Sequence, residues 1–238
     1  MVSAAIDASG QLDAVINNAA VKGKGSFADR DADAWWNQFD VSFRGTVEVT
    51  RAAWPYLAES GAGRLINTAS AGMLGNPGSS AHGAAKAAVW GLSNTLAHEG
   101  DTLGIRVHTI IPGAWTPLYE ENDRWRPEVE TAMREYFTTE RVASFVVWLA
   151  HPDTLVNIVG PNTLRIGGGH ARRGVFAVAP TVRPTLDTPD GWSEASATLA
   201  EGHDNLSSAM DLAEFVTHEL IAVSPSLEPL LRGNSLIQ

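Results

Sequence analysis

Short apolar runs alternate with long helical patterns over the first two thirds of the chain, and this alternation restricts the fold more than any other feature. The runs expected to form strands are 12–20, 64–68, 105–111 and 163–166. Apolar residues at helical spacing occur between them, over 34–59, 80–100 and 140–150. Strands that alternate with helices of this length build βαβ units, so the sequence predicts an α/β fold with a parallel sheet.

Several residues mark the expected ends of these elements. Asp33 is a candidate cap for the first long helix, and Pro55 should kink that helix or end it early. Pro112 and Gly113 should stop the third strand. After Gly174 the alternation ends, with one more short strand expected over 175–178. We therefore predict a core over 1–174 and a C-terminal extension with helical pieces over 175–238, which packs on the core or on a partner.

Composition excludes several classes of function. The 238 residues suffice for a sizeable core, and the formal net charge of −10 argues against binding to nucleic acid. The absence of cysteine excludes disulfides, thiolate metal sites and cysteine nucleophiles. The histidines show no metal-ligand spacing, so no metal is expected. No apolar run approaches the about 18 residues of a membrane span, and the first residues do not resemble a signal peptide, so a cytoplasmic protein without membrane contact is expected.

Four short motifs follow the predicted strands in a fixed order. They are Asn17-Asn18-Ala19-Ala20, Asn67-Thr68-Ala69-Ser70, His82-Gly83-Ala84-Ala85-Lys86, and Pro112-Gly113 with Thr116. In this order and spacing they resemble the short-chain dehydrogenase/reductase family. The stretches 51–54, 75–76, 92–97 and 188–189 are most similar to its multifunctional-enzyme group, which acts on 3-hydroxyacyl-CoA thioesters and steroids.

The resemblance implies a Rossmann-like, doubly wound parallel sheet and assigns roles to individual positions. The catalytic candidates are His82, Lys86, Ser70 and Thr68. The nicotinamide side of a cofactor site, here expected to be vestigial, would lie at Asn17, Asn18, Pro112, Gly113 and Thr116. The segment after Gly113 is where the family has its substrate flap, so an apolar ligand pocket is implied at Trp115, Tyr119 and Trp125.

Proton transfer in the family depends on a tyrosine whose pKa is lowered by a lysine four residues later on the same helix face. Lys86 matches that lysine, but His82 replaces the tyrosine. Repulsion by the Lys86 ammonium should favour the neutral imidazole, which would make His82 a base rather than an acid. An imidazole also reaches less far than a phenol.

Two further catalytic positions depart from the family pattern. Thirteen residues before His82, where the family has its serine, the chain has Ala69, and the hydroxyl occurs one residue later at Ser70. The supporting asparagine of the family aligns with Ser42. Three of four catalytic positions therefore differ, and only Lys86 is kept.

The family's dinucleotide seat requires a glycine-rich turn some tens of residues before the Asn17 motif, yet only sixteen residues precede it. We therefore expect an incomplete sheet that lacks the first βαβ units, and no cofactor. NAD or NADP would bind only if a partner chain, or residues upstream of a wrongly assigned start methionine, supplied the seat. Gly23-Lys24-Gly25-Ser26-Phe27-Ala28 formally matches a dinucleotide fingerprint, but it lies too far from the helix start and is interpreted as an ordinary loop.

An incomplete sheet would leave 12–16 as an apolar edge with unpaired backbone groups. The segment 175–178 or another protein chain should cover this edge. The family assembles through its two long helices, so we expect a homo-oligomer or a hetero-oligomer with a full-length short-chain dehydrogenase.

Three functions remain open from the sequence, including whether the chain is an enzyme. The first is a degenerate, non-redox subunit that contributes structure or a ligand pocket. The second is a cofactor-independent lyase, hydratase or isomerase that uses His82 as base with Lys86, Ser70 or Thr68 on a carbonyl, acyl-CoA or steroid-like substrate. The third is an NAD(P)-dependent oxidoreductase of 3-hydroxyacyl-CoA or hydroxysteroid type whose cofactor seat is supplied elsewhere.

Overall fold

Five strands form one sheet in the order β1-β2-β3-β4-β5. They are β1 (Ala14–Asn17), β2 (Arg64–Thr68), β3 (Arg106–Gly113), β4 (Asn162–Gly167) and β5 (His170–Val175). The first four strands are parallel to their neighbours, and β5 runs antiparallel to β4. The structure is a computed structural model that describes residues 1–21, 23–117, 125–154, 156, 162–175, 220–221 and 224–231. It confirms the predicted α/β, Rossmann-like fold class.

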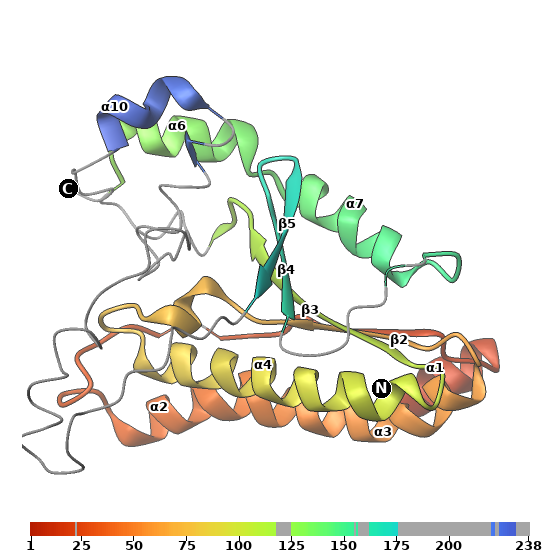
Figure 1. The fold of residues 1–238 in the computed structure, drawn as a ribbon. Coiled ribbons are helices and arrows are strands. Elements are labelled where there is room, and N and C mark those ends of the chain that lie inside the picture. Colours follow the sequence, from red (N-terminus) through yellow and green to blue (C-terminus); the bar gives the residue numbers. More distant parts are fainter. Residues whose placement is uncertain are drawn as a thin grey trace, which may run out of the picture. The chain divides into compact units, whose positions relative to one another are not determined.

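Helices flank both faces of this sheet (Figure 1). The α-helices are α1 (Val2–Ser9), α2 (Ala32–Phe39), α3 (Gly45–Glu59), α4 (Ser80–Asp101), α6 (Pro127–Tyr136), α7 (Thr139–Ala150) and α10 (Glu228–Leu231). A π-helical segment, η1 (Asp40–Arg44), joins α2 to α3, and two 3-10 segments are η2 (Ala71–Leu74) and η3 (Pro225–Leu227). Helices α3 and α4 pack on one face of the sheet and α7 packs against β2 and β4 on the other.

The first long helix differs from the prediction at its start and at its proline. Asp31 caps the helix, because its carboxylate accepts a hydrogen bond from the Ala34 backbone N–H at 2.8 Å, whereas Asp33 lies in the first turn. Of the two outcomes expected at Pro55, a kink or an early end, the early end does not occur, since α3 continues to Glu59, where the predicted helix ends. Leu57, which follows the proline, is fully buried against the sheet, and this burial outweighs one lost backbone hydrogen bond.

Two strand predictions are also corrected. Pro112 and Gly113 do not stop β3 but form its last two residues, where they pair with Ile166 and Gly167 of β4. The extra strand expected over 175–178 begins earlier, at His170, after a turn in which Gly168 and Gly169 have positive φ. Val175 is the last residue of β5, and 176–178 lie outside the described residues. Because β5 pairs with β4, Val175 lies at the opposite edge of the sheet from β1 and does not cover it.

Strand β1 is an edge of the sheet within the described part of the chain, where it pairs with β2 alone. Val15 is buried, but Ile16 is 49% exposed. The expectation of an apolar edge over 12–16 therefore agrees with the described residues. The expectation that another protein chain covers this edge stays a prediction.

The core consists of three apolar clusters. One lies between the sheet and helices α3 and α4, and a second packs α7 on the opposite face. The third gathers around α6 and includes Ala69, Phe137, Leu220 and Leu231. Leu220 and Leu231 are described residues of the predicted C-terminal extension, and both are buried here. The division at Gly174 stays a prediction. Among the described residues, no helix has the length and hydropathy to cross a membrane.

Candidate functional site

The motifs found in the sequence converge at the carboxyl ends of the parallel strands. Asn17 ends β1 and pairs with Asn67 of β2, while Thr68 ends β2 and pairs with Ile110 of β3. The chain then passes from Thr68 through η2 into α4, which carries His82 and Lys86. This edge of an open α/β sheet is where such folds bind ligands.

Lys86 connects α4 to the end of β2. Its side chain is only 4% exposed, and Nζ donates a hydrogen bond to the backbone oxygen of Thr68 at 2.6 Å. The Thr68 hydroxyl in turn donates to Oδ1 of Asn18 at 3.1 Å. Burial lowers the pKa of the Lys86 ammonium to about 8. Lys86 therefore remains mostly charged at neutral pH, held by a carbonyl rather than by a carboxylate.

His82 lies in the first turn of α4 and is partly buried. Burial, and to a lesser degree the charge of Lys86, lower the pKa of its imidazole to about 4. The neutral imidazole expected from the sequence is thus the form that the structure favours. Burial, which the sequence did not reveal, contributes more than Lys86. No described residue donates to the imidazole or accepts a hydrogen bond from it.

Ser70 lies beside His82 across the small residue Gly72. A Cβ placed on Gly72 would be 3.2 Å from Cδ2 of His82 and 3.4 Å from Oγ of Ser70. Ser70 caps η2, where its hydroxyl oxygen accepts from the Gly72 backbone N–H at 3.1 Å. The structure therefore brings His82 and Ser70 together, with Lys86 four residues further along α4 and Thr68 at the end of β2, two residues before Ser70. Ala69, at the family's serine position, is buried in the apolar cluster around α6.

Ser42, at the position of the family's asparagine, lies in the π-helical segment η1, which packs against α4. Its hydroxyl is buried and has no hydrogen-bond partner. The backbone oxygen of Ser42 accepts a hydrogen bond from the Thr46 hydroxyl at 2.9 Å. These contacts do not give Ser42 the supporting role that the asparagine side chain has at this position in the family.

A buried chain of hydrogen bonds beneath the site was not anticipated from the sequence. Nδ2 of Asn17 donates to Oγ1 of Thr50 at 3.0 Å and to Oδ1 of Asn67 at 2.8 Å. Nδ2 of Asn67 donates to Oγ of Ser93 at 2.9 Å. This series of hydrogen bonds links α3, β1, β2 and α4, and it uses both protons of the Asn17 side-chain amide. The sequence feature that could have indicated this hydrogen-bond series is Asn67, a polar residue within the apolar strand 64–68.

The predicted nicotinamide side is closely packed by protein. The ring of Phe137 would be 3.3 Å from a Cβ on Gly113, and the backbone N–H of Trp115 donates to the Phe137 oxygen at 2.6 Å. Pro112 and Gly113 are paired in β3, and Thr116 is half-buried three residues further on. All five predicted cofactor residues therefore lie at, or just after, the carboxyl ends of parallel strands. They are Asn17 and Asn18 after β1, and Pro112, Gly113 and Thr116 at and after the end of β3.

The described residues do not form a phosphate cradle for a dinucleotide. Such a cradle joins a strand directly to a helix N-terminus through glycines. The loop with Gly23 and Gly25 is separated from α2, which begins at Ala32, and the loop after β2 is filled by η2. The expectation that the chain has no cofactor seat of its own stays a prediction, and no chemical step is assigned to a dinucleotide here.

The aromatic residues of the predicted flap form a small cluster. Trp115 and Trp125 meet edge to face with ring centroids 6.3 Å apart, and Arg134 lies over the Trp115 ring at 4.7 Å. Both tryptophans pack on the apolar cluster that contains Ala69. Tyr119 lies outside the described residues. That these aromatics line a ligand pocket stays a prediction. No three His, Asp or Glu side chains within the described ranges gather as a metal site would require.

Comparisons with known proteins agree with this geometry. A family model described as short chain dehydrogenase matches residues 1–126. The chain is 43% identical over 119 residues to the peroxisomal hydratase-dehydrogenase-epimerase of Neurospora crassa, which covers 50% of this chain and 13% of that protein. It is 31% identical over 202 residues to a short-chain type dehydrogenase/reductase of Mycobacterium tuberculosis, covering 84% of this chain and 67% of that one.

Among solved structures, a short chain dehydrogenase from Mycobacterium avium superposes with a TM-score of 0.67 at 26% identity. The match covers 83% of this chain and 68% of that one. The chain spans only between 13% and 49% of the lengths of three peroxisomal relatives.

Proposed function

Because the chain belongs to the short-chain dehydrogenase family, we propose that it keeps the family's scaffold without carrying out its hydride chemistry alone. In this proposal the chain is a subunit of a homo-oligomer, or of a hetero-oligomer with a full-length relative. It contributes structure and the substrate-facing half of a pocket. The group that it resembles suggests a 3-hydroxyacyl-CoA thioester or a steroid-like molecule as the ligand of that pocket.

The observation that carries the proposal is the state of His82. An imidazole with a pKa of about 4 is protonated in about one molecule in a thousand at pH 7. It is therefore a poor proton donor, and the same low pKa makes it a weak base. The family's chemistry needs a group that can both donate and accept a proton near neutral pH. His82 beside Lys86 does not meet that requirement.

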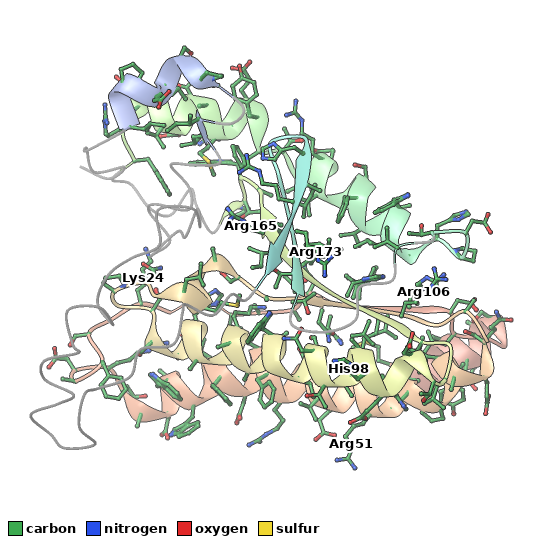
Figure 2. All side chains as sticks on the ribbon, viewed as in Figure 1. Lys24, Arg51, His98, Arg106, Arg165 and Arg173 are labelled. Carbon is green, nitrogen blue, oxygen red and sulfur yellow. The ribbon has the colours of Figure 1, made fainter. Side chains whose placement is uncertain are left out.

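A groove between α3 and α4 supports the role as a subunit. It has a volume of about 420 Å³, and its apolar walls include Val47, Trp54, Leu92 and Leu96. Arg51 and Glu99 line the same groove and carry opposite charges. Arg51 projects from α3 away from the sheet (Figure 2). An apolar groove with one cation and one anion suits packing against a similar pair of helices.

Three measurements on the purified full chain test the proposal. Native mass spectrometry should give a mass of at least two chains. NADH and NADPH fluorescence titrations should show no micromolar binding, and NAD or NADP with a 3-hydroxyacyl-CoA should give no reduced cofactor. Cofactor-dependent turnover by this chain alone would replace the proposal with an NAD(P)-dependent oxidoreductase.

A second candidate function rests on the closeness of His82, Ser70 and Lys86. Although its low pKa makes His82 a weak base, the neutral imidazole has a free lone pair for proton abstraction next to a carbonyl, where the Lys86 ammonium would stabilise the negative charge that develops. Such a lyase, hydratase or isomerase would need no dinucleotide. His82→Phe keeps a planar ring and removes the base, so a cofactor-free activity that survives this substitution would eliminate this candidate.

A further inference from the structure

A second pocket lies between the loop that leaves β1 and the first turns of α2, and its walls include none of His82, Lys86, Ser70 and Thr68. Its volume is about 510 Å³, which is within the range of small-molecule sites. Its described walls include Gly23, Lys24, Arg30 and Gln38. Figure 2 shows Lys24 on the loop near the end of the sheet at which α4 begins. The glycine motif singled out in the sequence thus borders a cavity.

The guanidinium of Arg30 is fixed at this pocket. Nη1 donates to the backbone oxygen of Gly23 at 3.1 Å, and Nη2 donates to that of Ala34 at 3.4 Å. A Cβ on Gly23 would be 2.1 Å from Nη2, so only glycine lets the guanidinium lie against the loop. The loop itself is held by a hydrogen bond from the Gly25 N–H to the Gly78 oxygen at 2.9 Å. The remaining N–H groups of Arg30 can bind an anion.

Gln38 provides an unpartnered acceptor at the same place. The residue is 2% exposed, and its Nε2 donates to the Val21 oxygen at 3.0 Å. Its Oε1 is buried and accepts no hydrogen bond. A Cβ on Gly23 would be 3.3 Å from Oε1, so the acceptor lies close to the point at which the Arg30 guanidinium meets the loop. A buried acceptor without a partner costs free energy that a ligand's donor group would recover.

The charges around the pocket narrow the ligand class. Lys24 and Arg30 are matched in number by the carboxylates of Asp29 and Asp31. A polyphosphate would meet both carboxylates, so the pocket does not suit a pyrophosphate despite the glycine motif. A single carboxylate on Arg30, with a hydrogen-bond donor beside it, satisfies both the guanidinium and Gln38.

We propose that this pocket binds a small carboxylic acid that carries a hydroxyl or amino group next to its carboxylate. The carboxylate accepts from Arg30 and Lys24, and the neighbouring donor bonds to Oε1 of Gln38. The proposal is independent of the function proposed for His82, because the two sites share no residue.

Ligand-observed NMR on the full chain tests this with matched probes. Lactate carries both groups, propionate lacks the hydroxyl, and isopropanol lacks the carboxylate. Lactate should bind in the millimolar range or tighter and about tenfold better than either control. Alanine in place of lactate tests whether an amino group serves as well as a hydroxyl, and its success or failure decides which of the two donors the site takes.

Two variants locate the binding. Gln38→Met removes the acceptor at similar volume and should reduce lactate affinity to that of propionate. Arg30→Gln, at a partly exposed position, should reduce it about tenfold even if Gln38→Met fails to fold. Equal binding of lactate and propionate, no binding of any probe in the millimolar range, or binding unchanged in Arg30→Gln would each overturn the proposal.

Discussion

The ammonium of Lys86 and the backbone oxygen of Thr68 lie 2.6 Å apart, which joins helix α4 directly to the end of β2. The bond holds a buried charge beside the imidazole of His82. The electrostatics of the site and the docking of α4 therefore depend on the same side chain.

Lys86→Met tests the electrostatic part of this relationship. Removing the ammonium abolishes its repulsion of a protonated His82, so the imidazole pKa should rise from about 4. It should remain below 6.5, because burial persists in the variant. An NMR titration of the His82 ring in both proteins measures the shift. An unchanged His82 pKa would show that Lys86 does not act on the imidazole.

The burial of His108 should make the free energy of unfolding depend on pH. It is 2% exposed on β3, neither ring nitrogen has a hydrogen-bond partner, and burial together with Arg64 and Arg106 lowers its pKa to about 4. Between pH 6.5 and 4 the unfolded chain binds the proton and the folded chain does not, so stability should fall as the pH falls. His108 should contribute up to about 3 kcal/mol of this loss.

Denaturant unfolding of the wild type and His108→Leu at pH 7 and pH 5 measures this contribution. The variant should lose less stability over that interval than the wild type, because leucine binds no proton in either state. Equal losses in the two proteins would contradict the role given to His108.

Two glycines of α4 should respond oppositely to alanine. A Cβ on Gly83 would be 2.9 Å from the backbone oxygen of Gly72, so Gly83→Ala must push α4 away from η2 and should cost about 1–3 kcal/mol. A Cβ on Gly91 would meet no atom within 4 Å, and the residue is exposed. Gly91→Ala should therefore stabilise the folded protein by about 0.5–1 kcal/mol. Thermal unfolding compares the two variants, and destabilisation of equal size in both would rule out the contact as the cause.

The Asn67–Ser93 hydrogen bond should couple the two residues energetically. Asn67→Ala and Ser93→Ala each leave a buried partner without its hydrogen bond and should cost about 1–3 kcal/mol. The double variant should cost less than the sum by about 0.5–1.5 kcal/mol. A double-mutant cycle in urea checks this, and strict additivity would mean that the bond contributes nothing.

The sequence predicted the fold where a strand is an apolar run with clear limits. The strand 64–68 follows Gly63 and was predicted to the residue. Strand β5 was misplaced, because Arg172 and Arg173 give it no apolar pattern, and backbone pairing with β4 defines it instead. The cap was assigned to the wrong aspartate, since Asp31 and Asp33 differ only in local backbone geometry.

For the site, sequence alone indicated which residues meet but not how they are held. The motif order placed His82, Lys86, Ser70 and Thr68 at one edge of the sheet. The spacing on α4 also indicated a neutral His82. The dominant cause of its low pKa is burial, which depends on packing between η2 and α4 and has no local signature. The hydrogen bonds that Asn67 makes with Asn17 and Ser93 likewise join residues that are 50 and 26 positions apart in the sequence.

The most direct test of the central claim is the rate of NADH or NADPH formation by the purified full chain with a 3-hydroxyacyl-CoA. The measurement should be repeated across neutral and alkaline pH and with His82→Phe as the matched control. No reduced cofactor is expected above the background set by His82→Phe at any pH. Turnover that requires the cofactor and is abolished by His82→Phe would contradict it.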